Sequence, residues 1–121
     1  MESNPLASLP KTWMIDLDGT ILVHNGHLNG GDELLAGTKE FFDSLDPDDV
    51  IIFTTARGEK DRETTEKFLQ ESAIQYSHII FGVTKGIRIL INDKKPDNTL
   101  TAYAINVDRN GGIKNPFLTI S

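Results

Sequence analysis

The chain has 121 residues, a net charge of −6 and no cysteine. Its length suits one domain over residues 1–121, and its acidic balance argues against a general nucleic-acid or anionic-membrane partner. The missing cysteines exclude a disulfide framework, a thiolate metal site and a cysteine nucleophile. No stretch approaches the roughly 18 apolar residues that span a bilayer, and the first residues lack the features of a signal peptide. We therefore expect a cytoplasmic protein without a membrane partner.

After an irregular lead-in at residues 1–10, strand-like and helix-like segments alternate. Helices are predicted over 32–45, where Asp32 can cap the first turn, and over 59–73. Strands are predicted at five short apolar runs, residues 12–16, 50–55, 78–83, 87–93 and 101–107. Turn signals after residue 107 precede apolar side chains that can pack back on the domain. The alternation predicts an α/β fold, a Rossmann-like three-layer sandwich with a central, mainly parallel sheet.

Polar side chains follow the predicted strands, at the edge where parallel sheets bind ligands. They are Asp16 and Asp18 after the first strand, Thr54 and Thr55 after the second, Lys85 after the third, and Asp93 and Asp97 after the fourth. A carboxylate can attack phosphorus, and magnesium prefers a few oxygen ligands together with water and phosphate oxygens. Lysine and hydroxyl groups can offset the charge of the transferring group. This set favours Mg²⁺-dependent phosphoryl transfer through an aspartyl-phosphate.

Four motifs in this order resemble those of the haloacid dehalogenase (HAD) superfamily. DLDGT at 16–20 resembles motif I, VIIFTTAR at 50–57 resembles motif II, and ILINDKKPD at 89–97 resembles motif IV. Lys85 takes the place of the motif III lysine, with Lys94 and Lys95 as alternatives. The resemblance implies a phosphomonoesterase that acts on a phosphorylated sugar or other small metabolite. The loop at 23–31 leaves no room for a cap domain, so the chain is most similar to small capless phosphatases associated with bacterial surface-polysaccharide pathways.

The resemblance implies a role for each motif residue. Asp16 would be the nucleophile and Asp18 the general acid and base. The phosphoryl group and its charge would be held by Thr54 and Lys85. The metal ligands would be Asp16, Asp18 through its backbone carbonyl, Asp93 and Asp97. The remaining phosphate or substrate contacts would come from Leu17, Gly19, Thr55 and Arg57.

Three residues carry competing interpretations. Asn92 stands where many members have the first of two aspartates, which leaves the second acidic role to Asp97. Arg57 could reach a substrate anion, but an ion pair with Glu59 or Asp61 is the simpler interpretation. The loop residues His24 and His27 are interpreted as exposed side chains, because no third ligand lies nearby for a zinc site.

Two other functions stay open at this point. A catalytically silent HAD-like binding or assembly module is favoured by Asn92 and opposed by the intact pair Asp16 and Asp18. A receiver-like phospho-signalling domain also uses aspartate, magnesium, threonine and lysine on a parallel sheet, but no aspartate ends the predicted strand at 78–83. We expect a small phosphorylated substrate as one partner. Because the site would be open and capless, we also expect a second copy of the chain that supplies a lid.

Overall fold

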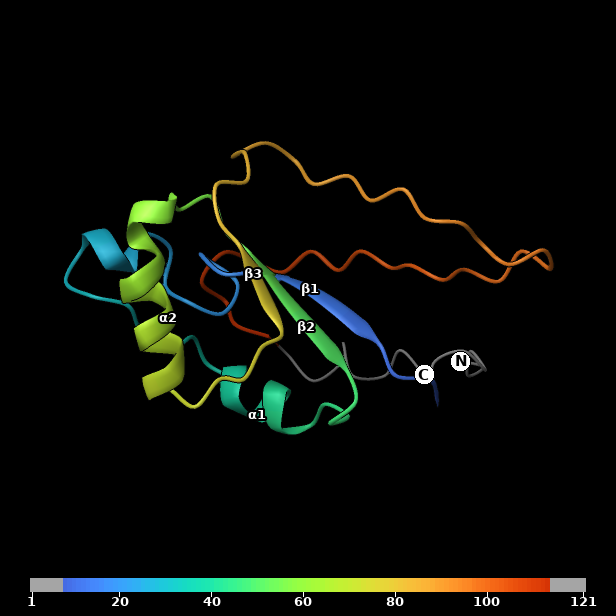
Figure 1. Cartoon of the computed structure of the whole chain (residues 1–121), viewed down its shortest axis with the longest axis horizontal. Helices are drawn as coiled ribbons and strands as arrows, with labels where there is room; N and C mark the ends of the chain where they lie inside the picture. Colours follow the sequence, from blue (N-terminus) through green and yellow to red (C-terminus); the bar gives the residue numbers. More distant parts are fainter. Residues whose placement is uncertain (1–7, 114–121) are drawn as a thin grey trace.

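The protein is built on a parallel three-stranded sheet. The computed structural model describes residues 8–113, so most of the predicted lead-in and the end of the chain lie outside the described residues. The strands β1 (Thr12–Asp16), β2 (Val50–Thr54) and β3 (His78–Ile80) lie in the order β1-β2-β3 (Figure 1). The register pairs Asp16 with Thr54, and Thr54 with Ile80, so the three carboxyl ends meet at one edge. The α/β fold with a parallel sheet is confirmed.

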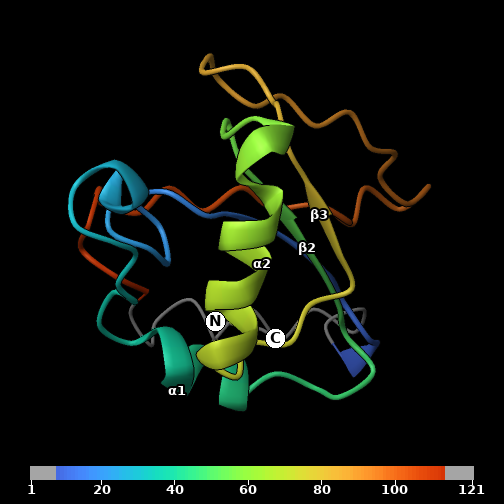
Figure 2. The same ribbon diagram turned by 60° about the vertical axis from the view of Figure 1, so that its left-hand side comes forward.

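One face of the sheet carries the hydrophobic core. Side chains alternate between the two faces of a strand, and Trp13, Ile15, Leu17, Ile51, Phe53 and Ile79 all belong to the core cluster or pack against it. The helices α1 (Thr38–Asp43) and α2 (Arg62–Glu71) supply the other side of this core; Figure 2 shows α2 in front of the sheet. Aromatic edge contacts, with ring centroids 5.2 to 5.8 Å apart, join Trp13, Phe41, Phe42 and Phe53. No helix within residues 8–113 is long and apolar enough to cross a membrane.

The opposite face of the sheet is open. Met14, Val50 and Ile80 are exposed on it, and Met14 keeps 56% of its surface accessible. All helical segments with residues in the core cluster pack on the other face, so the described residues form two layers of the predicted three. Parallel sheets are almost always covered on both faces, so this open apolar face is unusual.

The first predicted helix begins later than expected. Instead of starting near Asp32, α1 starts at Thr38, directly after Gly37 in the left-handed region at φ 83°. A Cβ at Gly37 would lie 2.3 Å from the carbonyl oxygen of Ile113, so tertiary contact with the end of the described chain sets the helix start. The second predicted helix consists of the 3-10 turn η3 (Glu59–Asp61) followed by α2.

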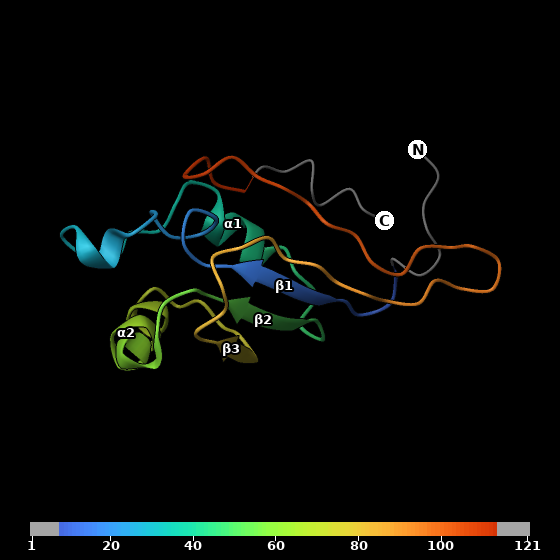
Figure 3. The ribbon, with the colours of Figure 1, turned by 90° about the horizontal axis from the view of Figure 1, so that it is seen from above.

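The fourth and fifth predicted strands are wrong. Residues 84–107, here called the arm, contain no strand or helix and project past the start of β1 (Figures 1 and 3). Adding another parallel strand requires a crossover of a dozen or more residues, and only residues 81–86 separate β3 from position 87. The arm instead turns back at its tip, where the Lys95 N–H donates to the Thr99 carbonyl (2.9 Å) and the Asn98 N–H to the Lys95 carbonyl (2.8 Å).

Candidate active site

A tight loop follows β1 and places the two motif I aspartates. The carbonyl of Leu17 accepts the N–H groups of Thr20, Ile21 and Leu22 at 3.0 to 3.2 Å. Gly19 makes the turn possible because its φ of 86° lies in the left-handed region, which side chains disfavour. The loop therefore wraps around one buried carbonyl, and Asp18 leaves the strand direction that Asp16 still follows.

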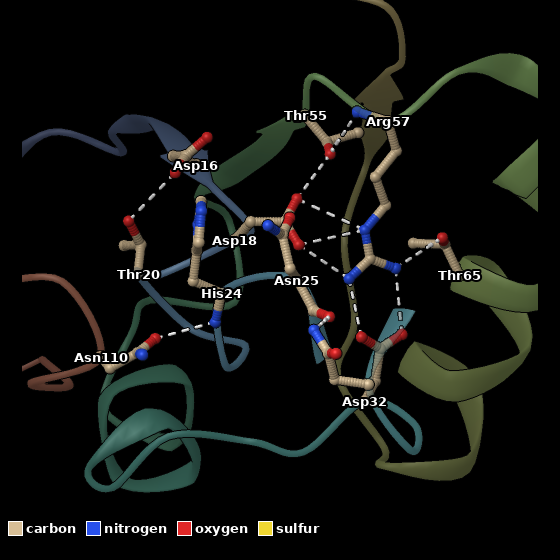
Figure 4. A network of polar contacts seen from close by, with 11 residues as sticks. Asp16, Asp18, Thr20, His24, Asn25, Asp32, Thr55, Arg57, Thr65 and Asn110 are labelled. Carbon is tan, nitrogen blue, oxygen red and sulfur yellow. Dashed lines mark hydrogen bonds and ion pairs between the residues drawn. The ribbon is translucent and has the colours of Figure 1, made fainter. Parts of the chain in front are cut away.

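Asp16 is the accessible carboxylate of the loop. Its side chain is 41% exposed, and its register partner on the same sheet face is Thr54. The Thr20 hydroxyl donates to Oδ2 (3.3 Å), and Nη2 of Arg88 lies 3.7 Å from Oδ1; Figure 4 shows the contact with Thr20. Partial burial raises the pKa of Asp16, although Arg88 and Thr20 act in the opposite direction. This arrangement suits a nucleophile that has one cation and two hydroxyl groups nearby.

Asp18 is held by a buried network that we call the Arg57 clamp: Asp18, Asp32, Thr55, Arg57 and Thr65. Nε of Arg57 donates to both carboxylate oxygens of Asp18 (3.1 and 3.3 Å), and Nη2 bridges Asp18 (2.8 Å) and Asp32 (2.7 Å). Nη1 donates to Asp32 (3.0 Å) and to the Thr65 hydroxyl (3.0 Å). All five N–H donors of the guanidinium are therefore used by protein groups (Figure 4).

The clamp fixes both the charge of Arg57 and the direction of the Asp18 carboxylate. The Arg57 side chain is 2% exposed; burial lowers its pKa, but the bonds to Asp32 and Asp18 outweigh burial and hold the pKa above its ordinary value. The Thr55 hydroxyl donates to Asp18 (3.0 Å) and accepts the Arg57 N–H (3.1 Å). Charged, bidentate hydrogen bonds of this kind are directional, so Asp18 is positioned before any substrate arrives.

The clamp corrects the interpretation of Arg57. Its guanidinium does not point to an open anion site, and its partners are neither Glu59 nor Asp61. Glu59 pairs instead with Arg62 (2.7 Å). Sequence reasoning missed Asp32, which was interpreted as a helix cap; the one available signal was an acidic residue directly after the glycine-rich loop.

Three of the predicted phosphate or substrate contacts, Leu17, Gly19 and Thr55, have backbone N–H groups with protein partners. The N–H of Leu17 donates to the Thr54 carbonyl (3.1 Å) and that of Gly19 to the Leu22 carbonyl (2.7 Å). The N–H of Thr55 donates to the Ile80 carbonyl (3.0 Å). Because these groups already have protein partners, they stabilise the loop and the sheet edge.

The motif IV residues lie toward the tip of the arm, away from this edge of the sheet (Figure 1). Lys85, Lys94 and Lys95, with Asp93 and Asp97, are exposed on the arm. Hydrogen bonding to the Thr99 side chain, and then to the Thr99 N–H (3.0 Å), lowers the pKa of Asp97. The Asn92 amide donates to Thr101 (2.7 Å). Arg88, which sequence reasoning did not select, is the arm cation that approaches Asp16.

The described residues supply only part of a magnesium site. No group of three or more His, Cys, Asp or Glu side chains within residues 8–113 is arranged to hold a metal. Magnesium in phosphoryl-transfer sites uses one or two carboxylates, with phosphate oxygens and water completing the shell. Asp16 fits as one such carboxylate, whereas the carboxylate of Asp18 is bound by Arg57.

The segment after the arm returns to the motif I loop. The Asn110 N–H donates to the Gly19 carbonyl (2.8 Å), and its side-chain oxygen accepts the His24 N–H (2.8 Å). Ile113 packs against the core. The prediction that this segment packs back on the domain is confirmed for its described part; residues 114–121 lie outside the description.

Comparison with known proteins gives a partial structural likeness. No protein-family model matches the chain, and no curated protein does. A chain in the "Structure of the Pnkp1/Rnl/Hen1 RNA repair complex" is 26% identical with a TM-score of 0.52; the match covers 73% of this chain and 30% of that one. A chain in the "Structure of Pnkp1/Rnl/Hen1 complex" has the same identity and TM-score, with 74% and 33% covered. The protein therefore spans about a third of the length of these neighbours.

Proposed function

We propose that the protein is a phosphomonoesterase of the HAD type with a capless, Rossmann-like core. The observation that carries the proposal is the different environment of the two aspartates at the end of β1. Asp16 is accessible beside Thr54, Thr20 and Arg88, whereas Asp18 is held by the Arg57 clamp two residues later. A nucleophile needs access to the substrate, and a general acid and base needs a fixed direction.

In the proposed reaction, a carboxylate oxygen of Asp16 attacks phosphorus and the bond to the leaving oxygen breaks. The protonated form of Asp18 gives its proton to that oxygen, so an alcohol leaves and the Asp18 carboxylate remains beside Arg57. Asp18 then takes a proton from water, which attacks the phosphorus of the aspartyl-phosphate and releases phosphate while Asp16 is regenerated. Thr54 and Arg88 offset charge on the transferring group. Asp16 and the backbone carbonyl of Asp18 would hold magnesium, which would supply positive charge at the phosphoryl oxygens.

The substrate class has two candidates. The motif resemblance favours a phosphorylated sugar or other small metabolite in a cytoplasmic pathway. The structural neighbours come from an RNA repair complex, which favours a phosphorylated RNA end and assembly with partner proteins. The experiment therefore includes RNA substrates, so that it also tests the expectation that the protein binds no nucleic acid.

The test measures phosphate release with and without magnesium from sugar phosphates, nucleotides and oligoribonucleotides that carry a terminal phosphate. We expect Mg²⁺-dependent release that Asp16→Asn abolishes, because the amide cannot attack phosphorus. Asp43→Asn, an exposed residue of α1, is the matched control and should keep full activity. Absence of release from every substrate would contradict the proposal and favour the silent assembly module.

A further inference from the structure

The arm carries an unusual amount of exposed apolar surface. Four large aliphatic side chains within five residues are 61% to 92% exposed, namely Ile87, Ile89, Leu90 and Ile91, and Ile105 on the returning half is exposed as well. Contiguous apolar surface of this kind marks an interaction site.

The open face of the sheet is a second surface with exposed apolar side chains, and by the strand register it also carries Thr12, Asp16, Thr54 and His78. It presents Met14, Val50 and Ile80, one from each strand, on the side that the helices do not cover. The arm of the same molecule leaves Met14, Val50 and Ile80 exposed. Its two ends are fixed near the sheet edge, and its tip projects past the start of β1 (Figures 1 and 3). Gly82 donates to the Arg57 carbonyl at one end (2.7 Å), and Asn110 to the Gly19 carbonyl at the other (2.8 Å).

The arm and the body of the protein, residues 8–83, carry opposite net charge. The arm has four Lys or Arg residues and two Asp, a net charge of +2. Residues 8–83 have six Lys or Arg and fourteen Asp or Glu, a net charge of −8. Lys94 and Lys95 lie at the tip of the arm, and Asp46 and Asp48 lie in the turn that leads into β2. Opposite fields of this kind favour association and fix its orientation.

We propose that two copies of the chain form a dimer in which the arm of each copy lies across the open sheet face of the other. A two-fold axis makes the exchange reciprocal, so one arrangement covers both apolar surfaces of both copies and places each basic arm against an acidic body. RNA is a poorer occupant for the arm, because its exposed side chains are mainly aliphatic. The inference goes beyond the proposed function and does not depend on phosphatase activity.

Cysteine cross-linking tests which chain the arm contacts, and the natural absence of cysteine makes the readout clean. An Ile91→Cys protein mixed with a Met14→Cys protein should give a covalent heterodimer under mild oxidation. Leu28→Cys in place of Ile91→Cys is the control, because Leu28 is also largely exposed (70%, against 92% for Ile91) but lies in η2 (Gly26–Leu28), away from the arm. We expect several-fold more cross-linked dimer with Ile91→Cys than with this control. An intramolecular disulfide in the double variant, without heterodimer in the mixture, would overturn the proposal.

Sedimentation of the full chain tests the association itself. The wild type should be a dimer, and Ile91→Lys or Met14→Glu should shift it to monomer while Leu28→Lys does not. Mixing the Ile91→Lys and Met14→Glu proteins should restore dimer, because one intact arm then meets one intact face. A monomeric wild type, or arm variants that leave the dimer unchanged, would overturn the proposal, as would an arm that binds oligoribonucleotide on a monomer.

Discussion

The Arg57 clamp is the most demanding arrangement at the residue scale. One guanidinium lies between two carboxylates, and neither Arg57 nor Asp32 keeps more than 3% of its side chain exposed. Removing one partner of such a group leaves uncompensated charge, whereas an exposed ion pair contributes little. The clamp should therefore affect both stability and the direction of Asp18.

Arg57→Ala should lower the free energy of unfolding by about 3–5 kcal/mol, since two buried carboxylates lose their cation. Arg62→Ala is the matched control: Arg62 also makes a bidentate pair, with Glu59, but on the surface, and its loss should cost much less than that of Arg57. Urea denaturation measures both values. If Arg57→Ala and Arg62→Ala lowered the free energy of unfolding equally, the Arg57 clamp would be exposed to solvent.

Asp32→Asn should lower kcat about 10- to 100-fold with little change in KM, because misplacing a catalytic group slows the reaction more than it weakens binding. Asp32 positions Asp18 through Arg57 and does not itself contact the substrate, so its replacement should lower kcat and leave KM nearly unchanged. Steady-state kinetics on the best substrate measure both constants. A raised KM at constant kcat would place Asp32 in substrate binding instead.

At the element scale, glycines 37 and 112 let two segments meet backbone to backbone. A Cβ on Gly112 would lie 2.1 Å from the Ala36 carbonyl oxygen, and one on Gly37 would lie 2.3 Å from that of Ile113. This contact both starts α1 and holds the segment after the arm. It explains why helical periodicity over 32–45 overestimated the helix.

Gly37→Ala should lower the free energy of unfolding by about 2 kcal/mol or more, from left-handed strain of about 1–3 kcal/mol together with the clash at Ile113. Gly58→Ala is the control, because Gly58 has φ −82° and a Cβ added there would meet no atom within 4 Å. Thermal or urea unfolding of the two variants provides the comparison. A Gly37→Ala protein as stable as the control would show that the contact relaxes without cost.

The elements that sequence reasoning predicted correctly are those whose signals are local. The apolar runs of β1 and β2 predicted parallel strands, and their register alone brings Thr54 beside Asp16. The strand predicted at 87–93 failed because a run such as Ile89–Ile91 does not encode the crossover that a parallel partner needs. The bond between Arg57 and Asp32 joins a strand end to a loop 25 residues away, and spacing does not predict such contacts.

At the scale of the whole molecule, the core and the arm are separate in composition and packing. No residue of the arm belongs to the core cluster or packs against it among the described residues, whereas Ile113 beyond the arm does. The molecule therefore consists of an acidic body and a basic arm, and hydrogen bonds hold both ends of the arm to the body.

Replacing residues 89–107 with a short Gly/Ser linker should change the free energy of unfolding of the monomer by less than about 1 kcal/mol, because few contacts are lost. Truncation after residue 107 is the contrasting variant; it removes Asn110 and Ile113 and should destabilise the protein measurably. Urea unfolding at concentrations below dimerisation measures both. A large loss in the linker variant would show that the arm packs on its own body in solution.

The loop between residues 19 and 35 is irregular, yet it is tied down at several points. Val23 donates to the Glu33 carbonyl (3.0 Å), Leu35 to the Ile21 carbonyl (2.8 Å), and Asp32 is bound to Arg57. Loops of this length usually move within nanoseconds to microseconds. Here, opening must break a buried charged network, so it becomes a rare, cooperative event of local unfolding. Amide hydrogens in the loop should then exchange as slowly as those of neighbouring strands, and Asp18 should keep one orientation throughout a catalytic cycle.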